Sequence, residues 1–209
     1  FLVSLVLTWL VRTFARRINF VDRPGGHKQH RSPVALGGGI AIATTILLFL
    51  VGGTLAARWL HHFSPLPDWL PSLLSVHLSG IASKLPVVLS VGGGILVLHV
   101  VGLIDDIKPL RWDVKLAAQF VVGVLVAWPG GIRAVEFLGA PVSVILTVFW
   151  IVLITNAFNF LDNMDGLSAG VAAICCAVFA VASAAAGQVF VPVMAWVGAG
   201  TCLGYLMFN

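Results

Sequence analysis

Two short polar stretches of this chain carry residue types that bind phosphates and metal ions. The first, 102-GLIDDIKPLRWDVK-115, places Asp105 beside Asp106, with Lys108 three residues after the first carboxylate. Adjacent carboxylates repel each other unless a cation lies near them, and Mg²⁺ takes carboxylate oxygens, water and substrate phosphates. On a helical turn Lys108 would share the side of Asp105 and meet a phosphate beside the metal. A solvated acidic loop is the alternative interpretation.

The second stretch, 155-TNAFNFLDNMDGLSAG-170, closes a strongly apolar run with polar groups at Asn156, Asn159, Asp162 and Asp165. On a helix of 3.6 residues per turn, a step of three residues falls about 60° short of a full turn. Successive polar groups therefore point in different directions around the helix end and do not form one stripe. Asp165 followed by glycine predicts the turn that ends the helix. Carboxylates at a membrane edge are costly and indicate a functional site, although a purely structural helix cap is also possible.

A third stretch, 22-DRPGGHKQHRSPVALGGGIAI-42, is predicted to be a loop because of its prolines and paired glycines. Its basic residues Arg23, Lys28 and Arg31 are suited to holding phosphate or anionic headgroups. They would equally serve to set membrane topology without any ligand. The glycines at 37–39 open the next apolar segment, where glycine usually permits close helix packing.

The elements that must position these residues are membrane-spanning helices. Of the 209 residues, 59% are hydrophobic and only 10% are charged, and the mean hydropathy is +1.04, which is far from the composition of soluble domains. A span needs about 20 mainly apolar residues. We therefore expect an all-α, polytopic transmembrane helical bundle with about seven spans, counting a partial first one: 1–11, 36–57, 85–104, 114–128, 141–160, 168–187 and 189–208.

These spans predict a single integral membrane domain over 1–209, and its beginning at Phe1 rather than Met and its stop at Asn209, where an apolar run ends, suggest truncation at both ends. One face receives loops 12–35, 105–115 and 155–167, which carry nine of the twelve basic residues. Loops 58–84 and 129–140 on the other face carry only Arg58, Lys84 and Arg133. The positive-inside rule makes the first face cytoplasmic. Because both carboxylate motifs and the basic loop reach that face, we expect an enzyme that joins a phosphorylated soluble substrate to a membrane-held one.

In these three motifs the chain resembles the polyprenyl-phosphate N-acetylhexosamine-1-phosphate transferase family. The matching residues occur in the family's order: Asp22-Arg23-Pro24 with Lys28, His30, Pro33 and Gly37-Gly38; then 102-GLIDDIK-108; then Asn156 and Asn159 with 162-DNMDG-166. The resemblance covers roughly the whole chain. Its 38-GGIAI-42 segment is more similar to the undecaprenyl-phosphate GlcNAc-1-phosphate branch than to the phospho-N-acetylmuramoyl-pentapeptide branch. His27, at a position often Arg, and Asn163, in place of a common Gly, depart from the family pattern.

The resemblance implies that a polyprenyl phosphate such as undecaprenyl phosphate attacks the β-phosphorus of a UDP-N-acetylhexosamine and releases UMP. It implies Mg²⁺ or Mn²⁺ as cofactor and a role in starting cell-wall or surface glycopolymers such as teichoic acid or lipopolysaccharide. It also implies a multi-pass protein of the bacterial inner (plasma) membrane with a cytoplasmic active site, with a homodimer as a possible assembly and no nucleic acid partner.

The resemblance also suggests a role for each site residue. Asp105, Asp106 and Asp162 are the expected catalytic residues, and Asp106 and Asp162 the expected metal ligands. The expected substrate-binding residues are Lys28, His30, Lys108, Asn156, Asn159 and Asp165. Family members continue past the equivalent of Asn209 into a segment with another metal-binding Asp and a His-rich loop, so the site in these residues is expected to be incomplete.

Two other functions also fit a helical bundle with membrane-edge carboxylates. A membrane prenyltransferase uses aspartates with Mg²⁺, but its Asp-x-x-x-Asp motif matches neither acidic pair here. A secondary transporter would place polar groups near mid-bilayer in related halves, whereas here they gather at one edge. A catalytically inactive remnant is a third possibility.

Overall fold

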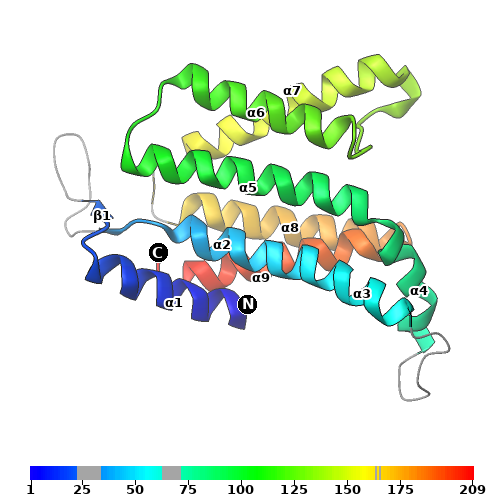
Figure 1. Ribbon diagram of the computed structural model, residues 1–209, viewed down its shortest axis with the longest axis horizontal. Helices are drawn as coiled ribbons and strands as arrows, with labels where there is room; N and C mark the ends of the chain where they lie inside the picture. The colour runs from blue at the N-terminus through cyan, green and yellow to red at the C-terminus, as the bar shows by residue number, and fades with distance from the viewer. Residues whose placement is uncertain (23–33, 63–71, 163, 165) are drawn as a thin grey trace.

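The computed structural model describes residues 1–22, 34–62, 72–162, 164 and 166–209, and this part of the chain is almost entirely helical (Figure 1). The α-helices are α1 (Leu2–Arg17), α2 (Gly38–Leu47), α3 (Gly53–His61), α4 (Ser72–Ser83), α5 (Leu85–Ile107), α6 (Trp112–Ala127), α7 (Ala140–Leu161), α8 (Leu167–Ala185) and α9 (Phe190–Leu206). A π-helical turn, η1 (Leu48–Gly52), joins α2 to α3, and a 3-10 turn, η2 (Glu136–Leu138), precedes α7. The all-α prediction is confirmed.

Four helical segments of the described chain are long and apolar enough to cross a membrane: Gly38–His61, Leu85–Ile107, Ala140–Leu161 and Leu167–Ala185. Helix α9 is apolar but has 17 residues, and α1 and α6 have 16 each. All seven predicted spans therefore coincide with helices, four of which reach full spanning length. The protein is a multi-pass helical membrane protein.

Two strands of two residues each are the exception to the helical pattern in the described chain. Strand β1 (Val21–Asp22) pairs antiparallel with β2 (Val34–Ala35), with Val21 opposite Ala35. The backbone N–H of Leu36 extends the ladder by donating to the carbonyl of Phe20 at 3.1 Å. This short ladder joins the end of α1 to the start of α2.

Local sequence signals explain where the helices around the polar motifs begin and end. Helices α5 and α7 each have a proline in the first turn, where its missing N–H costs no helical hydrogen bond. Helix α7 ends at Leu161, and Gly166 takes a left-handed conformation, with φ of 72°, immediately before α8. The predicted helix end within the second polar stretch is thus confirmed.

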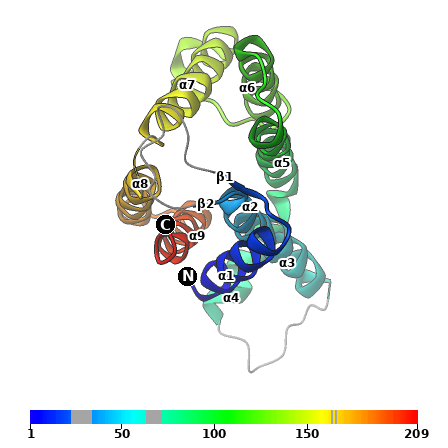
Figure 2. The ribbon, with the colours of Figure 1, turned by 90° about the vertical axis from the view of Figure 1, so that its left-hand side faces the viewer.

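The helices form two groups that meet at α2 and α5 (Figure 2). Helices α5, α6 and α7 pack in chain order on one side, while α1, α2, α8 and α9 pack together on the other. The second group joins distant parts of the chain, because α1 lies directly against α9. There the hydroxyl of Ser4 donates to the carbonyl of Thr201 at 2.7 Å.

Candidate functional site

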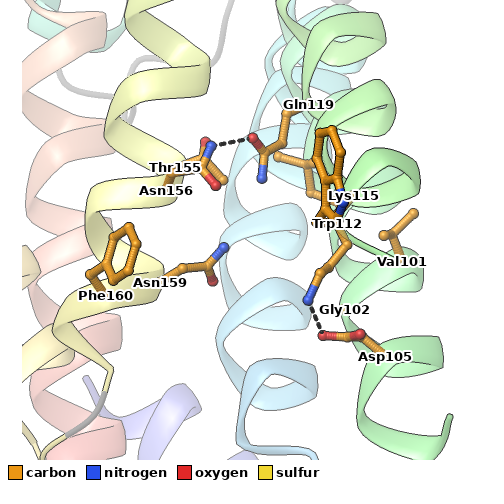
Figure 3. A pocket seen from close by; sticks show the side chains of 11 residues that line it. Val101, Gly102, Asp105, Trp112, Lys115, Gln119, Thr155, Asn156, Asn159 and Phe160 are labelled. Carbon is orange, nitrogen blue, oxygen red and sulfur yellow. Dashed lines mark hydrogen bonds and ion pairs between the residues drawn. The ribbon is translucent and has the colours of Figure 1, made fainter. Parts of the chain in front are cut away.

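A cavity of about 600 Å³ lies among α5, α6 and α7, at the ends of these helices that carry the polar motifs (Figure 3). Its volume is in the range of small-molecule sites, which lie between about 300 and 1,000 Å³. Its lining is Leu98, Val101, Gly102, Asp105, Trp112, Lys115, Gln119, Thr155, Asn156, Asn159 and Phe160. The cavity therefore brings together Asp105, the first residue of the Asp-Asp motif, and the two asparagines of α7, Asn156 and Asn159.

Asp105 connects the end of α5 to the following helix. Its carboxylate accepts a hydrogen bond from the backbone N–H of Leu110 at 2.7 Å and forms an ion pair with Lys115 at 3.1 Å. The Asp105 side chain is 29% exposed, so the pair is open to the cavity from one side. A carboxylate and an ammonium group are thus held together where a charged ligand can reach both.

Asn156 of α7 and Gln119 of α6 form a polar contact between these two helices. The Asn156 amide nitrogen donates to the side-chain oxygen of Gln119 at 2.5 Å and to the carbonyl of Val152 at 2.8 Å. Gln119 is only 4% exposed. A buried amide costs free energy unless it is hydrogen-bonded, so this pair gives α6 and α7 a specific polar contact.

Asn159 lies one turn beyond Asn156, and its amide points into the space between α7 and the other two helices (Figure 3). Trp112 and Phe160 lie at the rim and are 73% and 79% exposed. Tryptophan, whose indole ring carries one N–H, is common where apolar and aqueous surroundings meet. The cavity thus offers charged and amide groups within and aromatic surfaces at its mouth.

Asp106 and Asp162 lie at the same ends of α5 and α7 but do not line this cavity. Asp106 is exposed beside Asp105 and has a partner of its own. Asp162 directly follows α7 and is exposed on one side. Protein atoms packed around the rest of the residue desolvate its carboxyl group and raise the pKa of that group. A raised pKa indicates a carboxylate that would gain from a nearby cation.

Several acidic residues at this end of the helices are of the kind that binds metal ions. In the described part of the chain, no three His, Cys, Asp or Glu side chains lie close enough together to hold a metal ion. Mg²⁺ needs only one or two carboxylates when phosphates and water supply its other ligands. The two oxygens of Asp105 already have Leu110 and Lys115 as partners. The acidic residues thus suit a metal that arrives with a phosphorylated substrate.

The predicted position of Lys108 on the same helical turn as Asp105 was wrong. Helix α5 ends at Ile107, and Lys108 has extended backbone angles, with φ of −141° and ψ of 111°. Pro109 follows, and a proline disfavours helical geometry in the residue before it. Lys108 is exposed outside the cavity, and it is Lys115, from the first turns of α6, that pairs with Asp105.

Three predicted site residues, Lys28, His30 and Asp165, lie outside the described residues. The structure also adds two residues that sequence reasoning did not select, Lys115 and Gln119. Gln119 is the only amide in the apolar run 114–128, which was a usable signal. In the sequence, Lys115 was recognisable only as one of the nine basic residues that set the membrane topology.

The fold and the site together define a class: a polytopic helical membrane protein with a charged and amide-lined cavity at one end of three spans. Comparison with known proteins identifies the family. The model for glycosyl transferase family 4 matches residues 88–209, the part of the chain that contains the cavity. The chain belongs to glycosyl transferase family 4.

Similar proteins cover the whole chain. It is 28% identical over 218 residues to a probable undecaprenyl-phosphate N-acetylglucosaminyl 1-phosphate transferase of Bacillus subtilis, covering 100% of this chain and 53% of that protein. It is 32% identical over 233 residues to the decaprenyl-phosphate N-acetylglucosaminephosphotransferase of Mycobacterium leprae, covering 100% and 52%. It is 28% identical over 247 residues to the phospho-N-acetylmuramoyl-pentapeptide-transferase of Desulforudis audaxviator, covering 100% and 66%.

The chain spans about half the length of the first two of these relatives. No solved structure matches it.

Proposed function

We propose that the protein transfers an N-acetylhexosamine-1-phosphate from a UDP-sugar to a polyprenyl phosphate and releases UMP. One observation supports this above all. The cavity joins Asp105 and Lys115 to Asn156 and Asn159 at the ends of three helices. A phosphate and a nucleotide-sugar need charged groups and amides of these kinds, and a prenyl chain needs the apolar surroundings that the helices provide.

The relatives' names favour the same reaction. Those from Bacillus subtilis and Mycobacterium leprae are named as transferases of N-acetylglucosamine phosphate to undecaprenyl and decaprenyl phosphate. We propose GlcNAc-1-phosphate as the group transferred, undecaprenyl phosphate or a similar carrier as its acceptor, and a surface glycopolymer as the product's destination. We also propose UDP-GlcNAc as the donor.

In this proposal the side chains of the cavity divide the work of positioning two phosphorylated substrates. Asp105 positions the lipid phosphate, which is already largely dianionic at neutral pH because its second pKa is about 6. Lys115 exchanges its contact with Asp105 for a phosphate oxygen when substrate enters. Asn156 and Asn159 orient the nucleotide-sugar by hydrogen bonds. Phosphoryl transfer depends mainly on such positioning and on neutralising charge.

Mg²⁺ or Mn²⁺ belongs to the proposal as the cofactor that neutralises the diphosphate. Asp106 and Asp162 are the residues proposed to hold it. The raised pKa of Asp162 supports this assignment, because a cation would offset the cost of its desolvated charge. Lys28, His30 and Lys108 are proposed to contact phosphates, and Asp165 to contact the nucleotide-sugar.

The proposed location is the bacterial plasma membrane, with the cavity open to the cytoplasm. Nine of the twelve basic residues belong to segments 12–35, 105–115 and 155–167, and three belong to segments 58–84 and 129–140. That asymmetry favours a cytoplasmic position for the cavity. A homodimer remains a prediction.

The test is UMP release from UDP-GlcNAc in membranes that contain the protein at its natural length. We expect release to require both undecaprenyl phosphate and Mg²⁺. Asp105→Asn and Lys115→Met should each lower kcat/KM by about 100-fold or more, the effect of removing one charge-stabilising contact in an active site.

The matched control is Arg111→Met, which breaks the ion pair between Arg111 and Asp113 outside the cavity and should change the rate little. Release without lipid, or equal losses for Lys115→Met and Arg111→Met, would contradict the proposal. Release only with a UDP-sugar other than UDP-GlcNAc would retain the reaction and change the donor.

A further inference from the structure

An apolar groove runs between η1 and α3 on one side and α5 on the other. It has a volume of about 630 Å³ and is lined by leucines and glycines that include Leu48, Gly52, Leu55, Leu89 and Gly92. Four of the lining leucines are more than half exposed: Leu48 at 53%, Leu55 at 51%, Leu89 at 57% and Leu96 at 52%. Both walls belong to helical segments long enough to span a membrane. The groove therefore opens towards hydrocarbon and suits an extended alkyl chain.

The π-helical turn contributes directly to this groove. Leu48, Val51 and Gly52 all belong to the turn Leu48–Gly52 and all line the groove. A π-turn interrupts the regular packing surface of an α-helix and often marks a functional position. Gly52 and Gly92 leave the groove without side-chain bulk on both of its walls.

A second, polar pocket lies one helical turn further along α3. It measures about 230 Å³ and is lined by Arg58, His61, His62, Ala82 and Ser83. Leu55 in the groove and Arg58 in the pocket are three residues apart, or about 4.5 Å of helix rise. None of the pocket's lining residues, all within the described chain, is acidic, and Lys84 follows Ser83 directly. The pocket thus suits an anion.

The polar pocket lies at the end of the molecule remote from the catalytic cavity, and the apolar groove extends from Leu89 along α5 as far as Leu96. Figure 1 shows α3 and α4 meeting at one end of the molecule, while α5 runs from there to the other end. Helix α5 has 23 residues, or about 34 Å, which slightly exceeds the thickness of the hydrocarbon core of about 30 Å. Arg58 and Asp105 therefore lie near opposite membrane surfaces. Trp59, 62% exposed beside Arg58, is typical of such an interface.

From this juxtaposition we propose a binding site for an anionic phospholipid at the membrane surface opposite the catalytic cavity. One acyl chain lies in the groove between η1–α3 and α5, and the phosphate lies in the pocket of Arg58, His61 and His62. The guanidinium of Arg58 forms paired hydrogen bonds with phosphate oxygens. Each imidazole supplies an N–H donor in either protonation state.

The charge of the pocket determines the kind of lipid. A zwitterionic phospholipid would bring a choline or ethanolamine cation towards Arg58 and Lys84, whereas phosphatidylglycerol brings only its negative phosphate. The lipid of this site is also distinct from the acceptor of the proposed reaction, whose phosphate must reach Asp105 at the other surface. The site is thus a structural lipid site between α3 and α5.

The experiment is native mass spectrometry of the detergent-purified protein at its natural length. Phosphatidylglycerol and phosphatidylcholine with identical acyl chains are titrated separately. We expect one tightly bound phosphatidylglycerol and clearly weaker phosphatidylcholine. Arg58→Gln should weaken phosphatidylglycerol binding about tenfold, the effect of losing one charge-assisted hydrogen bond, and should reduce the preference for it.

Gly52→Leu tests the groove independently of the charge. Gly52 has helical angles, with φ of −61°, and an added Cβ would meet only the end of Leu48 at 3.9 Å, so leucine fits while it fills the groove. We expect it to weaken the binding of both lipids several-fold. Gly53→Leu is its matched control, because Gly53 has nothing within 4 Å and does not line the groove.

Arg133→Gln is the control for charge, since Arg133 is in the loop before α7, at the same end of the spans but outside the pocket. Both controls should bind phosphatidylglycerol as the wild type does. Equal binding of the two lipids by the wild type would overturn the proposal. So would unchanged binding in either Arg58→Gln or Gly52→Leu, provided that the variant elutes as the wild type in gel filtration.

Discussion

At the scale of single residues, the cavity depends on two polar pairs that join neighbouring helices. Lys115 of α6 pairs with Asp105 of α5, and Gln119 of α6 accepts a hydrogen bond from Asn156 of α7. Lys115 and Gln119 are four positions apart in α6, so they lie on one face of that helix. Helix α6 is thus the polar centre of the site, although most of its residues are apolar.

The pair of Gln119 and Asn156 should be energetically coupled. Gln119→Leu removes the cross-helix acceptor of the Asn156 amide, which keeps only the carbonyl of Val152, and should lower the free energy of unfolding by about 1–3 kcal/mol. Replacing both residues with leucine should cost less than the sum of the single changes, because no unpaired amide remains. Thermal unfolding in detergent measures all three variants.

Gln188→Leu serves as the control for that series, since Gln188 is exposed in the turn between α8 and α9. It should change the free energy of unfolding by no more than about 0.5 kcal/mol. Strictly additive effects of the Gln119 and Asn156 changes would show that the hydrogen bond contributes nothing.

Asp162 should make stability depend on pH and on divalent cations. Because desolvation raises its pKa in the folded protein above the ordinary 3.8, the folded state binds its proton more tightly than the unfolded state does. The contribution of Asp162 to stability then falls as pH rises from about 3.8 through the raised value. Without metal, Asp162→Asn should unfold at a higher temperature than the wild type at pH 7.5, and the difference should shrink at pH 4.

Adding Mg²⁺ extends the measurement on Asp162. If Asp162 holds the ion, Mg²⁺ should raise the unfolding temperature of the wild type at pH 7.5 and leave Asp162→Asn nearly unchanged. Asp113→Asn is the comparison, because Asp113 lies in the first turn of α6 and pairs with Arg111. That variant should be slightly less stable without metal and should keep the response to Mg²⁺. An equal Mg²⁺ response in both variants would remove Asp162 from the metal site.

At the scale of elements, close glycine contacts hold α5, α6 and α7 together around the cavity. A Cβ added to Gly94 of α5 would lie 2.8 Å from a methyl group of Val122. One added to Gly123 of α6 would lie 3.2 Å from the Cα of Val148 in α7, a backbone atom that cannot rotate away. The helices therefore approach as closely as small residues permit, as is common in membrane proteins.

Gly123→Ala should separate α6 from α7 and disturb the cavity. We expect a loss of about 1–3 kcal/mol in the free energy of unfolding, the usual cost of overpacking, together with weaker binding of UDP-GlcNAc. Gly170→Ala in α8 is matched to it, because nothing lies within 4 Å of its added Cβ. That change should be neutral or slightly stabilising through better helix propensity. Similar behaviour of the two variants would disprove the tight α6–α7 contact.

The helices themselves were largely predictable from the sequence, whereas their mutual contacts were not. Apolar runs of spanning length gave the positions of the helices, and glycine with proline gave several of their ends. The place of Lys108 was missed because helical periodicity was extended through Ile107 to a residue that precedes Pro109. Pairs such as Gln119 with Asn156, which are 37 residues apart, depend on the packing of helices, and no local pattern specifies that packing.

At the scale of the whole molecule, the contact between α1 and α9 closes the second group of helices. A Cβ added to Gly204 of α9 would lie 2.7 Å from the carbonyl oxygen of Phe1 and 2.9 Å from the backbone nitrogen of Leu5. Beside it, Ser4 is fully buried and bonded to Thr201. The chain's first and last described helices thus meet backbone to backbone.

Gly204→Ala should therefore weaken the whole bundle. Because the nearest atoms belong to the backbone of α1, we expect α1 to move away and the free energy of unfolding to fall by about 1–3 kcal/mol. Thermal unfolding in detergent gives the loss, and cleavage by a protease near the end of α1 reports the displacement. Gly80→Ala in α4, with nothing within 4 Å of its added Cβ, should leave both measurements unchanged. A stable Gly204→Ala variant would mean that α1 is not needed for closure.

The α1–α9 contact also has a consequence for biosynthesis. Ser4 and Thr201 are 197 positions apart, so a ribosome that adds about 5–20 residues per second makes the second partner roughly 10–40 s after the first. During that interval the small-residue face of α1 has no helix α9 to pack against. Either lipid or the insertion machinery must cover it, and the contact between α1 and α9 forms only after α9 has been synthesised.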